Sequence, residues 1–145
     1  MKTASFCFEV CGQDFISAGE AAMQVKRALR QMGYDGDLIR RVSVAMYEGE
    51  INMVLHADGG VAEIEIAPEE VRVTLTDRGP GIPDVELALR EGYSTATDSI
   101  RSLGFGAGMG LPNMKRFADE LTVSSELGVG TRIEMKFKIV KGEKR

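Results

Sequence analysis

The chain has 145 residues and a formal net charge of −4. This length is sufficient for a domain that buries its own core, and we expect residues 1–145 to form a single domain. A negative charge without a lysine- and arginine-rich block argues against binding to nucleic acid or to an anionic membrane surface. No apolar stretch approaches the roughly 20 residues of a membrane-spanning helix, and the start of the chain alternates instead of forming a signal-peptide core. We therefore expect a cytoplasmic protein.

The two cysteines, Cys7 and Cys11, are expected to be free thiols. They are four positions apart on a predicted strand, so their Cα atoms would be roughly 13 Å apart, beyond the reach of a disulfide. The chain has one histidine, which makes a zinc site of Cys and His ligands unexpected. We interpret both thiols as inert.

The spacing of the apolar residues differs along the chain: some segments show the period of a strand and others that of a helix. Alternation predicts a strand over residues 4–10, and spacings of three and four predict a helix over residues 17–32. A longer helix is expected to begin at a cap provided by Asp35 or Asp37 and to run to about His56. Further strands are predicted over residues 61–66, 71–76, 121–125 and 131–140, and a short helix over residues 83–89.

The predicted strand over residues 131–140 has the clearest pattern. Every second residue from Ile133 to Ile139 is apolar, and the residues between them are charged. Strands 61–66 and 71–76 alternate similarly, which indicates a sheet with one solvated face, because parallel strands covered on both faces are continuously apolar. We predict an α/β (α+β) two-layer sandwich, in which a mostly antiparallel mixed sheet carries helices on one face.

Residues 91–110 are rich in Ser, Thr and Gly and show no periodicity. A loop of this length inside a compact domain is commonly a functional lid. We therefore predict a lid over about residues 91–110.

The first group of functional candidates lies on the long predicted helix. Glu48, Asn52 and His56 are spaced by four and form one polar stripe. The neighbouring apolar stripe, which includes Val42 and Met46, must pack on the sheet, so the polar stripe is expected at the edge of the core. Spacing alone fits an ordinary solvated face equally well. In the functional interpretation, the carboxylate is a general base and the amide oxygen ligates Mg²⁺, an ion that often bridges phosphates to one or two protein groups.

The second group is the stretch DRGPGIP, which begins at Asp77 directly after a predicted strand. Asp, Gly and Pro are turn residues, so the stretch also fits an ordinary turn at the end of a strand. In the functional interpretation, the glycines allow the backbone to approach a flat ligand, and the carboxylate accepts a hydrogen bond from a group such as the adenine amino group.

The third group is the stretch GFGAGMG from Gly104 to Gly110, which precedes the helix-like sequence LPNMKRF. Glycine is costly to order and packs little, and a flexible linker would not normally lead into a helix. Glycines let successive amide groups converge on an anion, and the start of a helix adds its positive end. The stretch therefore favours a phosphate site, although its spacing matches neither GxGxxG nor GxxxxGK[ST].

In this order the three groups resemble the nucleotide-binding motifs of the GHKL ATPase superfamily, whose members share the Bergerat-type ATP-binding fold. The matching stretches are Glu48-x3-Asn52-x3-His56, Asp77-Arg-Gly-Pro-Gly81 and the glycine run from Gly104 to Gly110, and residues 128–131 resemble the final Gly–Thr turn of the family. The resemblance covers nearly the whole chain and agrees with the sandwich expected from alternation.

Within the superfamily, PGIPDVELALREGYST and GMGLPNMKRFADEL make the chain most similar to bacterial serine kinases of the anti-sigma factor and switch-kinase group. Those proteins are single domains that phosphorylate a serine on a small STAS-domain partner. The resemblance therefore implies a serine/threonine kinase that uses ATP and Mg²⁺. It also implies a STAS-domain partner, with a sigma factor or a phosphatase as a further partner, and it allows a homodimer.

The resemblance also assigns roles to individual residues. Glu48 is the general base and Asn52 the Mg²⁺ ligand. Asp77 holds the adenine amino group, with Gly81 and Thr131 near the ring. The residues assigned to the nucleotide are Asn52, Asp77, Gly79, Gly81, Gly104, Gly106, Gly108, Gly110, Leu111 and Thr131.

Two departures from the family pattern stand out. Gly49 and Glu50 follow the predicted base where a small apolar residue is common, and we expect them to loosen and charge that helical turn. No arginine stands just before the last glycines of the run, so the cation at the γ-phosphate is unassigned. Arg101 and Lys115 are the candidates.

Three other functions compete with a serine kinase. A nucleotide-gated binding module would use the same pocket as a switch, and hydrolysis alone would use Glu48 to activate water. The catalytic domain of a histidine kinase is disfavoured because no pair of dimerisation helices precedes the domain. The intact Glu48 favours catalysis over binding alone.

Overall fold

The computed structural model describes residues 4–11, 18–56, 59–79, 81 and 110–139. Its elements are β1 (Ala4–Cys11), α1 (Glu20–Gln31), α2 (Gly36–His56), β2 (Gly59–Ile66), β3 (Glu70–Asp77), α5 (Gly110–Phe117), β4 (Glu120–Glu126) and β5 (Gly130–Lys138). The helix predicted over residues 83–89 and all of the predicted lid except Gly110 lie outside the described residues.

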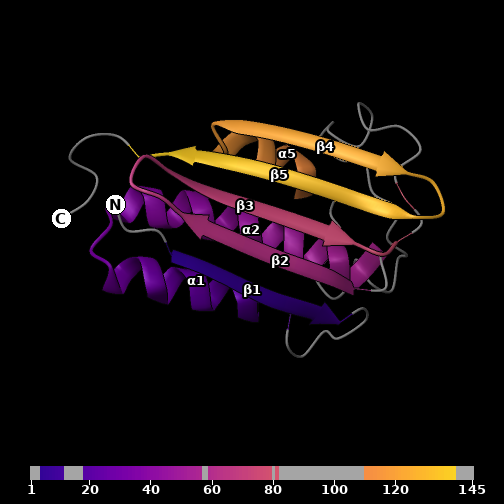
Figure 1. Cartoon of the computed structure of the whole chain (residues 1–145), viewed down its shortest axis with the longest axis horizontal. Coiled ribbons are helices and arrows are strands. Elements are labelled where there is room, and N and C mark those ends of the chain that lie inside the picture. Colours follow the sequence, from indigo (N-terminus) through magenta and orange to yellow (C-terminus); the bar gives the residue numbers. More distant parts are fainter. Residues whose placement is uncertain (1–3, 12–17, 57–58, 80, 82–109, 140–145) are drawn as a thin grey trace.

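The five described strands form one sheet in the order β1-β2-β3-β5-β4, and every pairing is antiparallel. Figure 1 shows α1, α2 and α5 together behind this sheet, on the same face. The two-layer sandwich predicted from alternation is therefore confirmed. Cys7 and Cys11 both lie on β1 and are exposed, free thiols, as expected.

The core lies between the two layers. On α2, the predicted apolar stripe is buried, with Val42 and Met46 fully enclosed. On β5, Ile133, Met135 and Phe137 face the helices, while the charged residues between them face solvent. Burial of these complementary apolar faces is the main stabilising contribution to the sandwich. No helix in the described part of the chain is long and apolar enough to cross a membrane.

The start of α1 is capped by a side chain from α2. Gly19 precedes the helix with a positive φ of 94° and offers no side chain for capping. The buried Glu50 carboxylate instead accepts hydrogen bonds from the backbone N–H groups of Gly19 and Ala21 at 2.9 and 3.2 Å, and from that of Ala22 at 3.0 Å. These amides have no partner within α1, so a carboxylate at this end satisfies them and complements the helix dipole.

The expectation that Glu50 charges this helical turn leaves out its main contacts, which are with the start of α1. Its side chain is only 2% exposed and joins two helices. The helix predicted from residue 17 begins instead at Glu20, because this distant cap sets its first turn.

At the start of α2, Asp35 is the capping residue. Its carboxylate accepts a hydrogen bond from the backbone N–H of Asp37 at 3.0 Å. The Asp37 carboxylate contacts Arg41 Nε at 3.0 Å and Arg40 at 3.4 Å. The hydrogen bond from Arg41 is the main reason why the pKa of Asp37 lies below its ordinary value.

Candidate functional site

A single glycine brings α2, β3 and α5 into close contact. A Cβ atom at Gly49 would clash with Leu75 Cδ1 of β3 and would lie 3.4 Å from Met114 Sδ of α5. Gly49 therefore permits a close helix–sheet contact, and the expectation that it loosens the turn was wrong. Because Leu75 precedes Asp77 by two positions on β3, this contact also brings α2 close to the end of that strand.

Along α2, the predicted base Glu48 precedes Gly49, and the predicted metal ligand Asn52 follows it. Glu48 and Asn52 are half-buried on α2, one turn apart. Glu48 Oε1 accepts a hydrogen bond from Asn113 Nδ2 of α5 at 3.3 Å. No described residue forms a hydrogen bond with the Asn52 side chain. This agrees with the expectation that the polar stripe runs along the edge of the core.

The helix predicted after the glycine run is present as α5. It begins at Gly110, the last glycine of the run, and Leu111 and Met114 anchor it in the core. The first backbone N–H groups of a helix lack intrahelical partners, so this end presents donors and a positive dipole to an anion. Lys115, a candidate for the γ-phosphate, is exposed on α5.

The α5 and α2 helices run in opposite directions. The Arg40 guanidinium lies 5.3 Å from the centre of the Phe117 ring, near the beginning of α2 and the end of α5. Asn113 contacts Glu48 further along α2. Because the two helices are antiparallel, Asn52 lies further toward the start of α5 than Glu48 does. It is therefore the nearer of the two to Gly110 and the end of the glycine run.

Asp77 organises a second part of the site at the end of β3. Its Oδ1 atom accepts hydrogen bonds from the backbone N–H of Gly79 at 3.0 Å and from that of Thr131 at 2.9 Å. The Thr131 hydroxyl lies 3.0 Å from the Ser125 hydroxyl of β4. No donor from the described part of the chain reaches Asp77 Oδ2, which is the oxygen that can accept a hydrogen bond from a ligand.

Close backbone packing holds the turn after Asp77 in place. Gly81 has a φ of +85°, and a Cβ atom there would lie 2.7 Å from the carbonyl oxygen of Glu126. A Cβ atom at Gly130 would clash with the carbonyl oxygen of Asp77. Gly81 and Gly130 therefore allow β3 and the β4–β5 turn to pack closely, a role that their local spacing does not reveal.

The described residues thus divide the predicted site into two groups. Glu48 and Asn52 lie beside α5, which carries Gly110 and Leu111, and Asp77 gathers Gly79 and Thr131. Four of the predicted residues lie outside the described part of the chain: Arg101, Gly104, Gly106 and Gly108. For His56, the backbone is described and the side chain is not.

Two contributors were absent from the sequence-based site. Asn113 contacts the predicted base, and Glu50, two positions after the base on α2, caps the start of α1. The sequence offered one usable signal for Asn113, its position in the first turn of the helix after the glycine run.

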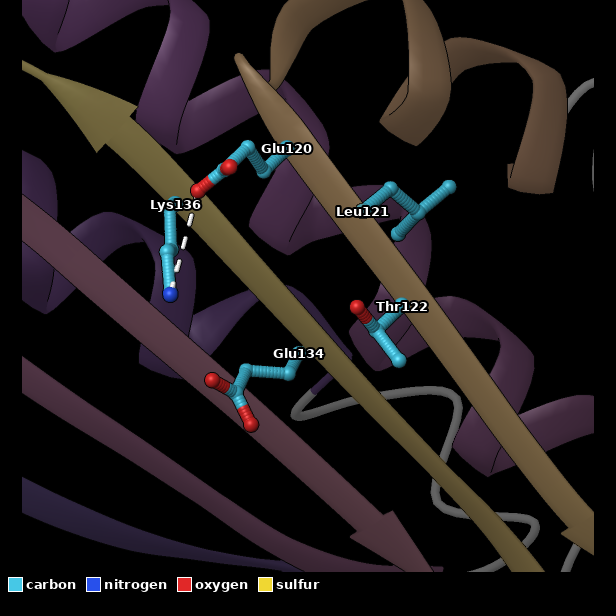
Figure 2. A pocket seen from close by; sticks show the side chains of 5 residues that line it. All are labelled: Glu120, Leu121, Thr122, Glu134 and Lys136. Atoms are coloured by element: carbon cyan, nitrogen blue, oxygen red, sulfur yellow. Dashed lines mark ion pairs between the residues drawn. The ribbon is translucent and has the colours of Figure 1, made fainter.

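A depression of about 350 Å³ lies elsewhere, on the outer face of the sheet. Figure 2 shows Glu120 and Lys136 paired across β4 and β5, with Glu134 and Thr122 beside them. The Nζ–Oε2 distance of this pair is 3.8 Å. Glu120 pairs with Lys136, and Glu134 pairs with Arg72 and Arg132. Because its charged side chains are paired in this way and it faces away from α2, we do not interpret the depression as the functional site. Among the described residues, no three His, Cys, Asp or Glu side chains gather as they would in a metal centre.

The chain matches a known protein family over most of its length. Residues 26–141 match the model of the family described as histidine kinase-, DNA gyrase B- and HSP90-like ATPases. The match covers most of the chain, and the protein belongs to this family. Membership of this family supports the use of ATP.

Two relatives illustrate the similarity within the family. The chain is 32% identical over 119 residues to the serine/threonine-protein kinase RsbT of Bacillus subtilis (strain 168), covering 79% of this chain and 84% of the relative. It is 33% identical over 135 residues to an anti-sigma F factor of Clostridium botulinum (strain Eklund 17B / Type B), covering 86% of this chain and 91% of the relative.

Solved structures show the same fold at lower identity. A structure of the RsbU and RsbW domains of a Mycobacterium tuberculosis protein matches with a TM-score of 0.61 and 17% identity. The match covers 94% of this chain and 32% of that longer chain. The mycobacterial sensor histidine kinase MprB matches with a TM-score of 0.53 and 18% identity, over 93% of this chain and 97% of that chain.

Proposed function

We propose that this protein is an ATP-dependent protein serine/threonine kinase that phosphorylates a serine on a STAS-domain partner, as part of a partner-switching regulatory module in the cytoplasm. Membership of the ATPase family supports ATP as the phosphoryl donor. The similarity to relatives named serine/threonine-protein kinase and anti-sigma F factor supports a protein substrate. The observation that carries the proposal is the contact at Gly49, which holds Glu48 and Asn52 beside the helix that follows the glycine run.

The described residues suit the binding of ATP. Asp77 Oδ2 accepts a hydrogen bond from the adenine amino group, while Oδ1 stays bonded to the backbone of Gly79 and Thr131. The backbone at Gly110 and Leu111 donates to the phosphates, together with Gly104, Gly106 and Gly108. The positive end of α5 favours this anion. Gly81 lies beside the ring.

Asn52 is the protein ligand that we propose for Mg²⁺. Its amide oxygen is a hard donor and has no hydrogen-bond partner among the described residues. Mg²⁺ is commonly held by one or two protein groups plus substrate phosphates and water. When bound, it would neutralise charge on the phosphates during transfer.

Glu48 is the general base in this proposal. It removes the proton of the substrate serine hydroxyl as Oγ attacks the γ-phosphorus. The bond from that phosphorus to the β–γ bridging oxygen breaks, and ADP keeps its electron pair. Phosphoryl transfer depends mainly on positioning and charge stabilisation. General-base assistance contributes about 10²–10⁴-fold in rate.

The test is transfer of labelled phosphate from ATP·Mg²⁺ to STAS-domain proteins encoded near this one. Wild type should label one of them on a serine, and replacing that serine with alanine should abolish the signal. Glu48→Ala should retain ATP affinity and slow transfer by about 10²–10⁴-fold. Equal loss of ATP affinity and transfer would show that Glu48 is structural, and absence of labelling with every partner would contradict the kinase proposal.

A second candidate is a nucleotide-gated anti-sigma or STAS-binding module without significant kinase activity. The similarity to anti-sigma F factors favours this alternative. It predicts ATP-dependent binding of a sigma factor or STAS partner that Glu48→Ala leaves unchanged, with no label on the partner. A phosphatase partner and a homodimer stay predictions from the resemblance.

A further inference from the structure

Asn113 links the helix after the glycine run to the predicted base. Its Nδ2 atom donates a hydrogen bond to Glu48 Oε1 at 3.3 Å, and both side chains are half-buried. The two residues are 65 positions apart in the sequence. The contact lies next to Gly49 and Met114, where α2 and α5 approach closely.

This hydrogen bond distinguishes the two oxygens of the base. Oε1 already accepts a hydrogen bond from Asn113, and no described residue donates one to Oε2, so we take Oε2 as the oxygen that accepts the proton from the substrate. A glutamate side chain has three rotatable bonds, and holding it in one orientation costs conformational entropy. A hydrogen bond to an ionised carboxylate is stronger than one between neutral groups and favours one orientation.

The position of Asn113 also connects the base to the phosphate-binding end of α5. It lies three residues after Gly110, in the first turn of the helix. Leu111 and Met114, on either side of it, are buried and fix the helix against the core. The orientation of Glu48 therefore depends on α5 being docked with its first turn in place.

We propose that Asn113 is a positioning residue for phosphoryl transfer, which orients the Glu48 carboxylate toward the substrate hydroxyl. This inference rests on the proposed function, because it assumes that Glu48 is the base. A merely structural tie between the helices would instead lower stability and nucleotide affinity without acting specifically on the transfer step.

The test compares Asn113→Ala with a matched control, Gln24→Ala. Gln24 Nε2 donates to Glu20 Oε1 at 3.2 Å, which is the same kind of amide–carboxylate contact on the exposed surface of α1. Asn113→Ala should lower kcat by about 10–100-fold, since misplacing a reacting group by about 1 Å can cost 10²-fold. The KM for ATP and the thermal midpoint should stay close to wild type. Gln24→Ala should leave kcat unchanged.

Two further variants separate positioning from packing. Asn113→Gln keeps an amide donor on a longer side chain and should recover part of the lost kcat. In a Glu48→Ala background, Asn113→Ala should have no further effect on transfer, because it acts only through the missing carboxylate.

The outcomes distinguish this inference from the proposed function. If wild type transfers phosphate and Asn113→Ala keeps its kcat, the positioning role is overturned and the kinase proposal stands. A further fall in the Glu48→Ala background, or a rise in KM alone, would also overturn it. If wild type labels no partner on a serine, the kinase proposal fails, and the positioning role, which rests on it, fails with it.

Discussion

The two oxygens of the Asp77 carboxylate differ in their hydrogen-bond partners. Oδ1 accepts two backbone hydrogen bonds, which tie the end of β3 to Gly79 and to Thr131 of β5. These bonds hold the carboxylate in one orientation before any ligand arrives. In our proposal, Oδ2 then meets the adenine amino group without a large rearrangement, and such preorganisation lowers the entropic cost of binding.

Glu50 should be among the most important residues for stability outside the core. Glu50→Ala removes a buried acceptor from three backbone N–H groups at the start of α1. We expect the free energy of unfolding to fall by about 2–3 kcal/mol, since hydrogen bonds to charged groups are strong and the loss of a helix cap is costly. Urea denaturation monitored by circular dichroism measures this change.

The control for this prediction is Glu63→Ala. Glu63 is exposed on the outer face of β2, and its replacement should change the free energy of unfolding by no more than about 0.5 kcal/mol. Similar values for the two variants would contradict the capping role of Glu50.

At the scale of single elements, Gly49 determines how closely α2 packs on the sheet. In an exposed helix, replacing glycine with alanine stabilises by about 1 kcal/mol. At Gly49 the added methyl group would clash with Leu75, so we expect Gly49→Ala to lower the free energy of unfolding by about 1–3 kcal/mol. ATP affinity should also fall, because α2 would move relative to β3 and α5.

Gly36→Ala provides the control on the same helix. A Cβ atom at Gly36 would have no neighbour within 4 Å, so this variant should be as stable as wild type or slightly more stable. Equal stabilisation by both substitutions would show that α2 does not depend on a small residue at position 49.

The start of α2 should respond to acid through Asp37. The hydrogen bond from Arg41 is the largest cause of the lowered pKa of Asp37, so the ionised carboxylate is favoured in the folded state. Its contribution to stability is therefore present above the ordinary value of 3.8 and is lost as the pH falls through the lower folded value. Because Asp37 is exposed, we expect this contribution to be small.

Carboxyl titration by NMR measures this shift directly. Wild type should show a pKa for Asp37 below 3.8, and Arg41→Gln should raise it toward that value. Arg40→Gln should have the smaller effect, because its contact with Asp37 is longer, at 3.4 Å against 3.0 Å for Arg41. The opposite order would contradict the assignment of Arg41 as the main partner.

At the scale of the whole molecule, local patterns were sufficient to predict the layers. Alternation in the strands required one solvated face, and the period of α2 required one buried stripe, so the two-layer arrangement followed. The contacts between distant segments could not be predicted in this way. Glu50 meets Ala21 across 29 positions, and Glu48 meets Asn113 across 65.

In the candidate site too, relations within one element could be predicted from the sequence, and contacts between distant segments could not. Spacing by four predicted that Glu48 and Asn52 share a helix face, because the helical period fixes that relation. The packing roles of Gly49 and Gly130 depend on which atoms of other elements approach them. No local period encodes such an approach, so the packing roles of these two glycines could not be predicted from their spacing.

The central claim is that α2, the end of β3 and the start of α5 together hold one ATP·Mg²⁺. Calorimetric titration of ATP with and without Mg²⁺, in wild type and in Asn52→Ala, tests it most directly. The claim predicts that wild type binds ATP more tightly with Mg²⁺, and that Asn52→Ala loses this gain while binding metal-free ATP as wild type does. No heat of binding with wild type, or an undiminished Mg²⁺ effect in Asn52→Ala, would contradict it.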